Sequence, residues 1–151
     1  MREKIEFELE QLRQLLAAHS ELIAACRERV PTAIELSALA MLLHSFYTGV
    51  ENIFKRIIVE GDGEPVRGEA WQRDLLDRMA VAKGARPAVI SIELRDQLDD
   101  YLAFRHVFRH VYSFELSWEK LGRLIFDYPG IQAKVTAEVT AFGRQLPAAG
   151  K

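Results

Sequence analysis

Two of the four histidines and two arginines lie close together in one short segment of the chain. Residues 101–112 read YLAFRHVFRHVY. The candidate functional residues of this run are Arg105, His106, Arg109, His110 and Tyr112. Histidine titrates near neutral pH and can take or give a proton, whereas arginine stays charged and can grip a phosphate through two parallel hydrogen bonds. The combination favours chemistry on a phosphate group.

Cleavage of RNA without a metal ion needs both of these residue types. A base must remove the proton of the 2′-hydroxyl group, and a cation must stabilise the charge that develops on the phosphate in the transition state. His110 suits the first role and Arg105 suits the second. We therefore take Arg105 and His110 as candidate catalytic residues.

A helical wheel, at about 100° per residue, shows where these side chains point. With Leu94 at zero, Arg105 falls at about 20°, inside an arc of apolar residues. His106 and His110 fall at about 120° and 160° on the polar side, and Arg109 falls at about 60° between the two. Arg105 and His110 thus diverge by about 140° on a straight helix. Either the helix distorts near its end, or two copies of the segment meet across a dimer axis, and an apolar arc that carries an arginine favours the dimer.

Arg105 also has a purely structural explanation. A guanidinium on an apolar face is costly unless it is paired or faces a second subunit. Glu51 borders the apolar arc of the preceding long helical segment and is the candidate partner. His106 and His110 are four residues apart, which is a metal-ligand spacing, but no Asp, Glu or Cys neighbour completes such a site. We therefore expect no bound metal and no other cofactor.

The elements that position this segment follow from the placement of Gly and Pro, which mark where helices end. Only Pro31 and Gly49 interrupt residues 1–60, four Gly and Pro residues crowd into 61–68, and none occurs in 88–121. Apolar residues recur from Ile5 to Val30 at alternating steps of four and three, as in a helix of a bundle. The helices expected from these patterns cover residues 2–30, 32–60, 69–82, 91–112, 117–127 and 131–146.

Three helix starts carry local signals. Thr32 and Glu35 form a T-x-x-E capping box directly after Pro31, so the second helix must fold back antiparallel to the first. Ser91 and Ser117 are expected N-caps of two later helices. Pro129–Gly130 is expected to separate the last two helices. Together these features predict an all-α antiparallel bundle of about five to six helices.

Composition limits the class of protein. The 151 residues are 49% hydrophobic and 28% charged with a net charge of −2, which is typical of one globular domain, expected here to span 1–151. So small a net charge excludes binding of nucleic acid by bulk electrostatics.

The single cysteine, Cys26, lies on an apolar seam and is expected to be a buried, inert thiol. The start of the chain lacks a signal pattern and no continuous apolar run reaches about 18 residues, so we expect a cytoplasmic protein without a membrane partner.

At these residues the chain resembles a known family. Arg105 to Tyr112 read RHVFRHVY, which matches the R-x4-H motif of HEPN ribonucleases and, more narrowly, the R-x4-H-x-Y motif of HepT-like toxins. The phrases LHSFYTGVENIF (43–54), WQRDLL (71–76) and RPAVIS (86–91) are also similar to the HepT-like group. The resemblance covers about residues 33–118. Within this range the sequence differs from the family at Gln72, where many relatives carry histidine.

The resemblance implies a homodimeric helical bundle that acts as a metal-independent endoribonuclease toxin of a toxin–antitoxin system. Such enzymes leave 2′,3′-cyclic phosphate and 5′-hydroxyl ends. Arg105 and His110 match the catalytic positions, and His106 matches the polar position that often follows the motif arginine. Arg109 and Glu51 are expected to support them.

The resemblance also implies a protein partner. HepT toxins are paired with a small MntA-type nucleotidyltransferase antitoxin, which attaches AMP to the motif tyrosine, here Tyr112. The added charge and bulk would occupy the place that an RNA phosphate must take. Some members of the fold have lost ribonuclease activity and serve as substrate-binding or scaffold subunits beside a nucleotidyltransferase. An inactive helical partner subunit is therefore the alternative function.

Overall fold

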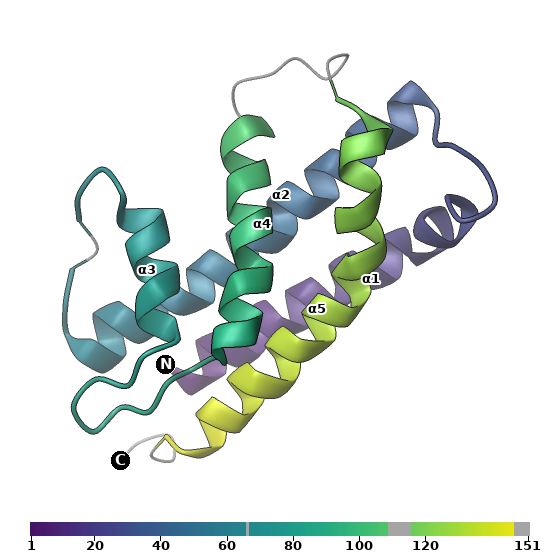
Figure 1. The fold of residues 1–151 in the computed structure, drawn as a ribbon. Coiled ribbons are helices and arrows are strands. Elements are labelled where there is room, and N and C mark those ends of the chain that lie inside the picture. The colour runs from purple at the N-terminus through teal and green to yellow at the C-terminus, as the bar shows by residue number, and fades with distance from the viewer. Residues whose placement is uncertain (66, 109–115, 147–151) are drawn as a thin grey trace.

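The computed structural model describes residues 1–65, 67–108 and 116–146, and this part of the chain is helical without a β-strand. The predicted all-α bundle is confirmed. Five α-helices and one π-helical turn make up the described part (Figure 1): α1 (Arg2–Ala25), α2 (Ala33–Arg56), η1 (Ile57–Asp62), α3 (Trp71–Met79), α4 (Ile92–Phe108) and α5 (Trp118–Arg144).

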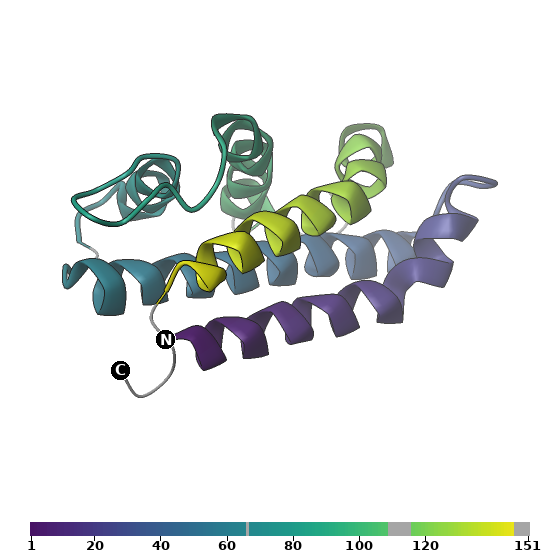
Figure 2. The same ribbon diagram turned by 90° about the horizontal axis from the view of Figure 1, so that it is seen from below.

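Helix α2 is the centre of the bundle and contacts all four other α-helices. Figure 2 shows it between α1 on one side and α3 and α4 on the other. Among the described residues, one continuous helical stretch, Ala33–Asp62, is long and apolar enough to cross a membrane by length and composition alone. In the bundle, its fully buried side chains, such as Leu42, Phe46 and Ile53, belong to the common hydrophobic core.

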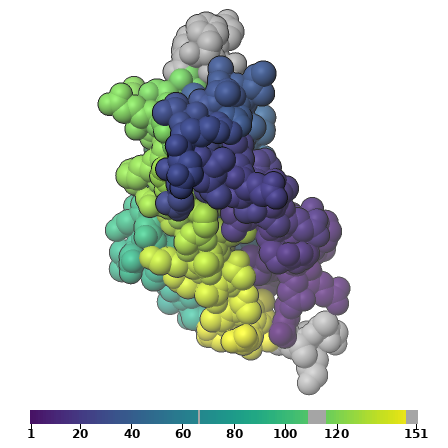
Figure 3. Space-filling model, turned by 90° about the vertical axis from the view of Figure 1, so that its right-hand side faces the viewer, coloured from purple at the N-terminus to yellow at the C-terminus, as the bar shows by residue number. Residues whose placement is uncertain are grey.

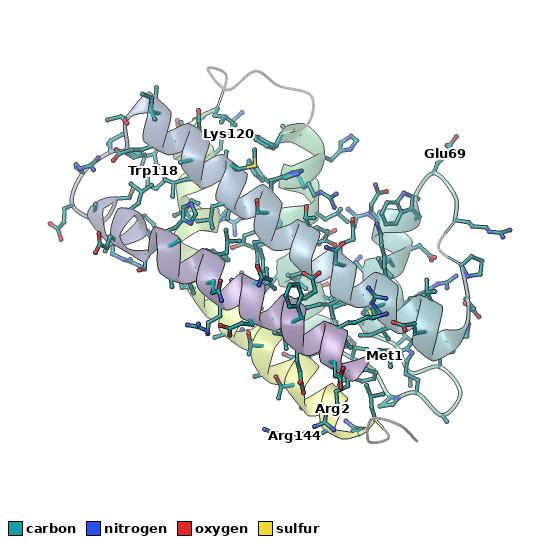
Figure 4. The ribbon with its side chains drawn as sticks, turned by 180° about the vertical axis from the view of Figure 1, so that it is seen from behind. Met1, Arg2, Glu69, Trp118, Lys120 and Arg144 are labelled. Carbon is teal, nitrogen blue, oxygen red and sulfur yellow. The ribbon has the colours of Figure 1, made fainter. Side chains whose placement is uncertain are left out.

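Helices α1 and α5 lie side by side and run in opposite directions on the face shown in Figure 3. Met1 and Arg2 at the start of α1 therefore lie near Arg144 at the end of α5, while Trp118 lies at the far end of the molecule (Figure 4). The two helices are linked in the core, where the side chain of Gln132 donates to the backbone oxygen of Leu12 at 2.8 Å.

The connection between α1 and α2 contains the predicted capping box. Thr32 Oγ1 accepts a hydrogen bond from Glu35 N at 3.1 Å, and Glu35 Oε1 accepts one from Thr32 N at 2.9 Å. The first helix ends at Ala25 rather than at Val30, because residues 26–29 form hydrogen-bonded turns that begin the reversal of the chain. Cys26 lies in these turns and is buried, as predicted. Burial raises the pKa of its thiol, which keeps it protonated near neutral pH.

The break predicted at Pro129–Gly130 is wrong, because α5 runs through both residues as one helix. Pro129 has no N–H to donate to the preceding turn, so it removes a backbone hydrogen bond but leaves the helix intact. The residues on either side of it are held in the core: Tyr128 and Ile131 are buried, and the Tyr128 hydroxyl donates to Gln132 Oε1 at 2.6 Å. Packing on both sides of the proline thus outweighs the local signal, and α5 bends without ending (Figure 1).

Candidate active site

Helix α4 carries Arg105 and is fixed against α5 at two points. Ser91 caps the start of α4 by accepting from Leu94 N at 3.1 Å, as predicted, and it also bonds to Glu138 of α5. Farther along, the buried Tyr101 hydroxyl donates to the backbone oxygen of Leu124 at 2.7 Å. These bonds set the rotation of α4, so that residue 105, one turn beyond Tyr101, points into the bundle.

Arg105 forms the ion pair that was considered from the sequence. Its Nη1 lies 2.7 Å from Glu51 Oε2 of α2, and only 7% of Arg105 and 3% of Glu51 are exposed. Neither Nη1 nor Nε of Arg105 has a well-aligned hydrogen bond to another described residue. The contact is therefore mainly electrostatic, and part of the donor capacity of the guanidinium is unused within the described bundle.

Glu51 is shared between two cations. Its Oε1 lies 3.7 Å from the ammonium of Lys55, one turn farther along α2. Lys55 also stands over the ring of Trp71 in α3, 4.3 Å from its centroid. The guanidinium of Arg105 lies 5.9 Å from the ring centroid of Tyr47, whose hydroxyl pKa is raised by burial and then by the charge of Glu51. Tyr47 therefore stays neutral, and the cluster of Arg105, Glu51 and Lys55 keeps a net positive charge.

Arg105 lines an open hollow of about 430 Å³ between α3 and α4. The side formed by the start of α3 contributes Ala70, Gln72 and Arg73, and α4 contributes Arg105, His106 and three apolar residues. Two arginines and one histidine thus line the hollow, and the described lining includes no carboxylate. The carboxylates paired with these arginines, Glu51 and Asp99, do not line the hollow, so its described wall presents the two guanidinium groups to an anion.

The other predicted site residues divide into two groups. His106 is exposed on α4 and lines the hollow beside Arg105, which agrees with its predicted place on the polar side of the helix. Arg109, His110 and Tyr112 lie outside the described residues. Their roles, and the approach of His110 to Arg105, stay predictions.

The remaining histidines belong to the helical framework. His19 Nδ1 lies 2.9 Å from the backbone oxygen of Leu15 in its own helix, and the His44 ring packs against Phe108 with 5.5 Å between centroids. Within 1–65, 67–108 and 116–146, no three His, Cys, Asp or Glu side chains are grouped as metal ligands.

Two residues of the hollow were not recognised from the sequence. In the sequence, Gln72 was identified only as a difference from the family pattern, and Arg73 was not assigned a role. The helix that carries them was predicted, but its packing against α4 was not, since its apolar pattern shows which face is buried and not which helix covers it. The phrase Trp71–Gln72–Arg73 inside the family resemblance was the one available signal.

A bundle of this architecture, with an inward-pointing arginine that begins an R-x4-H-x-Y sequence beside an open hollow, is a HEPN-type helical domain. The comparison with protein families is specific: a model described as a HepT-like protein matches residues 38–146, and the chain belongs to this family. Membership indicates a HEPN-type, ribonuclease-like role. Comparisons with curated proteins and with solved structures gave no match.

Proposed function

We propose that this protein is a metal-independent endoribonuclease toxin, with Arg105 and His110 as its working pair in a cleft between two copies of the chain. The observation that carries the proposal is the open hollow beside Arg105, which is lined by cationic side chains and no described carboxylate. An RNA phosphate is the anion that this sequence motif is suited to receive. In this proposal, the toxin acts on RNA in the cytoplasm.

The reaction needs no group beyond the protein and the RNA. His110 takes the proton of a 2′-hydroxyl group, and the 2′-oxygen attacks the adjacent phosphorus. The bond from phosphorus to the 5′-oxygen breaks, and that oxygen takes up a proton from the solvent. The products carry a 2′,3′-cyclic phosphate and a 5′-hydroxyl. Arg105 stabilises the charge that the phosphate gains in the transition state, and its ion pair with Glu51 holds the guanidinium in place beforehand.

Control of the activity follows from the motif tyrosine. In this proposal, a nucleotidyltransferase antitoxin of the MntA type transfers AMP from ATP to the Tyr112 oxygen. A bond forms between that oxygen and the α-phosphorus, pyrophosphate leaves, and the phenol loses its proton. The attached phosphate places negative charge near the motif and competes with the RNA backbone for the same cations.

One observation favours the second candidate, a helical partner subunit without catalytic activity. Glu51 already neutralises Arg105 inside the bundle, which is what a structural ion pair does. In that case the hollow would be a surface feature, and the motif would serve packing alone.

The test is cleavage of a short RNA by the purified protein in EDTA, followed by analysis of the product ends. We expect 2′,3′-cyclic phosphate and 5′-hydroxyl ends. Replacing the nucleotide on the 5′ side of the cleaved bond with its 2′-deoxy form should stop cleavage there, because the attacking oxygen is missing. Protein that cuts no RNA under these conditions would support the inactive partner subunit instead.

A further inference from the structure

The first turn of α3 faces the hollow and has the features of an anion-binding helix start. Ala70 is its N-cap and supplies no side-chain hydrogen bond, so the first N–H groups of this nine-residue helix have no side-chain cap. Such groups, together with the positive end of the helix dipole, attract phosphate. Ala70, Gln72 and Arg73 line the hollow directly.

Arg105 supplies the independent observation. It lines the same hollow from the side of α4, it is 7% exposed, and its Nε has no hydrogen-bond partner among the described residues. A buried cation with unused donor capacity and an uncapped helix start therefore meet at one space. Both features favour an anion in this space.

Arg73 has a charge that can serve an additional phosphate. Its Nη1 pairs with Asp99 of α4, but 48% of its side chain is exposed, so the rest of the guanidinium can still reach a ligand. Glu69, in the loop before α3, projects into solvent (Figure 4), and Asp74, the residue after Arg73, is exposed and pairs with Arg78. On the α3 side, the described lining of the hollow thus includes the charge of Arg73 and no carboxylate.

Gln72 offers hydrogen bonds without charge. The residue is partly buried, and its side-chain amide, which carries both donors and an acceptor, makes no hydrogen bond to another described residue. Leu102 and Val107 give the same hollow an apolar wall on which a base can pack. Proteins recognise single-stranded RNA in this way, through stacking and hydrogen bonds to exposed base edges.

We infer that the hollow between α3 and α4 binds the RNA nucleotide next to the cleaved phosphate, with Arg73 contacting its phosphate and Gln72 contacting its base or sugar. This inference rests on the proposed function and names a part of its substrate site. In this site Arg73 and Gln72 position the RNA, and they take no part in proton transfer.

The test measures binding of a short RNA that carries a 2′-deoxy nucleotide at the cleaved position, by fluorescence anisotropy at several salt concentrations. Arg73→Ala should weaken binding about tenfold, as expected for loss of one hydrogen bond to a charged group. It should also reduce the slope of log K against log salt by about 0.7, since one phosphate contact to a single strand is lost. Gln72→Ala should weaken binding about fivefold without changing that slope.

Cleavage of the ordinary RNA gives a second readout. Arg73→Ala should raise KM about tenfold and change kcat by less than about twofold, because the lost contact acts on binding in the ground state and the transition state alike. A variant that only disturbed the fold would lower kcat as well, and its thermal unfolding would shift.

Two matched controls separate RNA contact from structural support. Asp99→Asn breaks the same ion pair but keeps Arg73, so it should bind RNA at least as tightly as the wild type. Arg123→Ala removes another arginine that pairs with an α4 carboxylate, Asp100, but it does not line the hollow. Equal weakening by Arg73→Ala and Asp99→Asn, or an Arg73→Ala protein that binds like Arg123→Ala, would overturn the inference alone. A wild type that neither binds nor cuts RNA would overturn the inference together with the proposed function.

Discussion

Arg105 is at once a buried side chain of the core and the cation of the proposed reaction. Glu51 reconciles the two roles, because it offsets the cost of burying the guanidinium and also fixes its direction. Lys55 shares the same carboxylate, which prevents Glu51 from cancelling the positive charge of the cluster. We therefore expect removal of either partner to destabilise the fold, whether or not the chain cuts RNA.

Glu51→Ala should reduce the free energy of unfolding by about 3 kcal/mol, because it leaves a buried guanidinium without its partner. Urea unfolding followed by circular dichroism measures the change. The double variant Glu51→Ala with Arg105→Ala should lose less than the two single variants combined, since no charge is then left unpaired. Strict additivity of the two losses would show that the observed contact contributes nothing to folding.

Tyr112→Phe tests the proposed control of activity. The variant should still cut RNA, because the hydroxyl takes no part in the reaction, but it should escape inhibition by the cognate nucleotidyltransferase and ATP. Intact-mass spectrometry should show added AMP on the wild type and none on the variant. AMP on the Tyr112→Phe protein, or a wild type that its cognate enzyme never modifies, would remove this form of control.

At the scale of the elements, the close approach of α1 and α2 depends on Gly49. A Cβ atom at this position would lie 2.6 Å from Leu12 Cδ2, inside the contact distance of real side chains. Gly49→Ala would gain helix propensity, but the displaced Leu12 side chain is part of the core, and overpacking of this kind costs about 1–3 kcal/mol.

We therefore expect Gly49→Ala to lower the free energy of unfolding by about 1 kcal/mol, measured by urea unfolding. Gly130→Ala is the matched control, because Gly130 also lies inside a helix but a Cβ atom there would meet nothing within 4 Å. That variant should gain about 0.5–1 kcal/mol from helix propensity. An increase in stability for both variants would mean that α1 and α2 are less tightly packed at this point than the structure shows.

Helix starts were predictable from the sequence wherever the signal is local. The Thr32–Glu35 box and the Ser91 cap depend on side chains that bond to backbone groups only a few residues away. Ser117 was also placed correctly as an N-cap, although its side chain makes no capping hydrogen bond. The prediction of a helix break at Pro129 was wrong for a non-local reason. Tyr128 and Ile131 are buried against other helices, and these contacts keep α5 continuous but cannot be read from the neighbouring sequence.

The candidate site was likewise predictable only where it depends on a single helix. The helical wheel placed Arg105 within an apolar arc and made Glu51 one candidate partner, and the structure shows this pair within the single chain. Gln72 and Arg73 could not be placed, since their position depends on how α3 docks against α4 after a loop. Lys55 was missed because a lysine near a helix end is ordinarily a solvated side chain, and only its contacts with Glu51 and Trp71 give it a role.

At the scale of the whole molecule, we expect a dimer. A twofold interface brings two copies of the motif together, which would let Arg105 of one copy meet His110 of the other. Light scattering at micromolar concentration should give about twice the chain mass of 17.2 kDa. A mass equal to one chain would contradict the shared cleft.

RNA cleavage without metal by an enzyme that uses His110 and Arg105 can be tested by comparing three proteins. RNA cleavage in EDTA is compared for the wild type, His110→Ala and the control His19→Ala, whose imidazole bonds within its own helix α1. We expect His110→Ala to lose about 10²–10⁴-fold in rate, the usual contribution of general acid–base catalysis, with little change in thermal unfolding. The His19→Ala protein should keep its activity. An active wild type whose rate is unchanged in His110→Ala would contradict the claim.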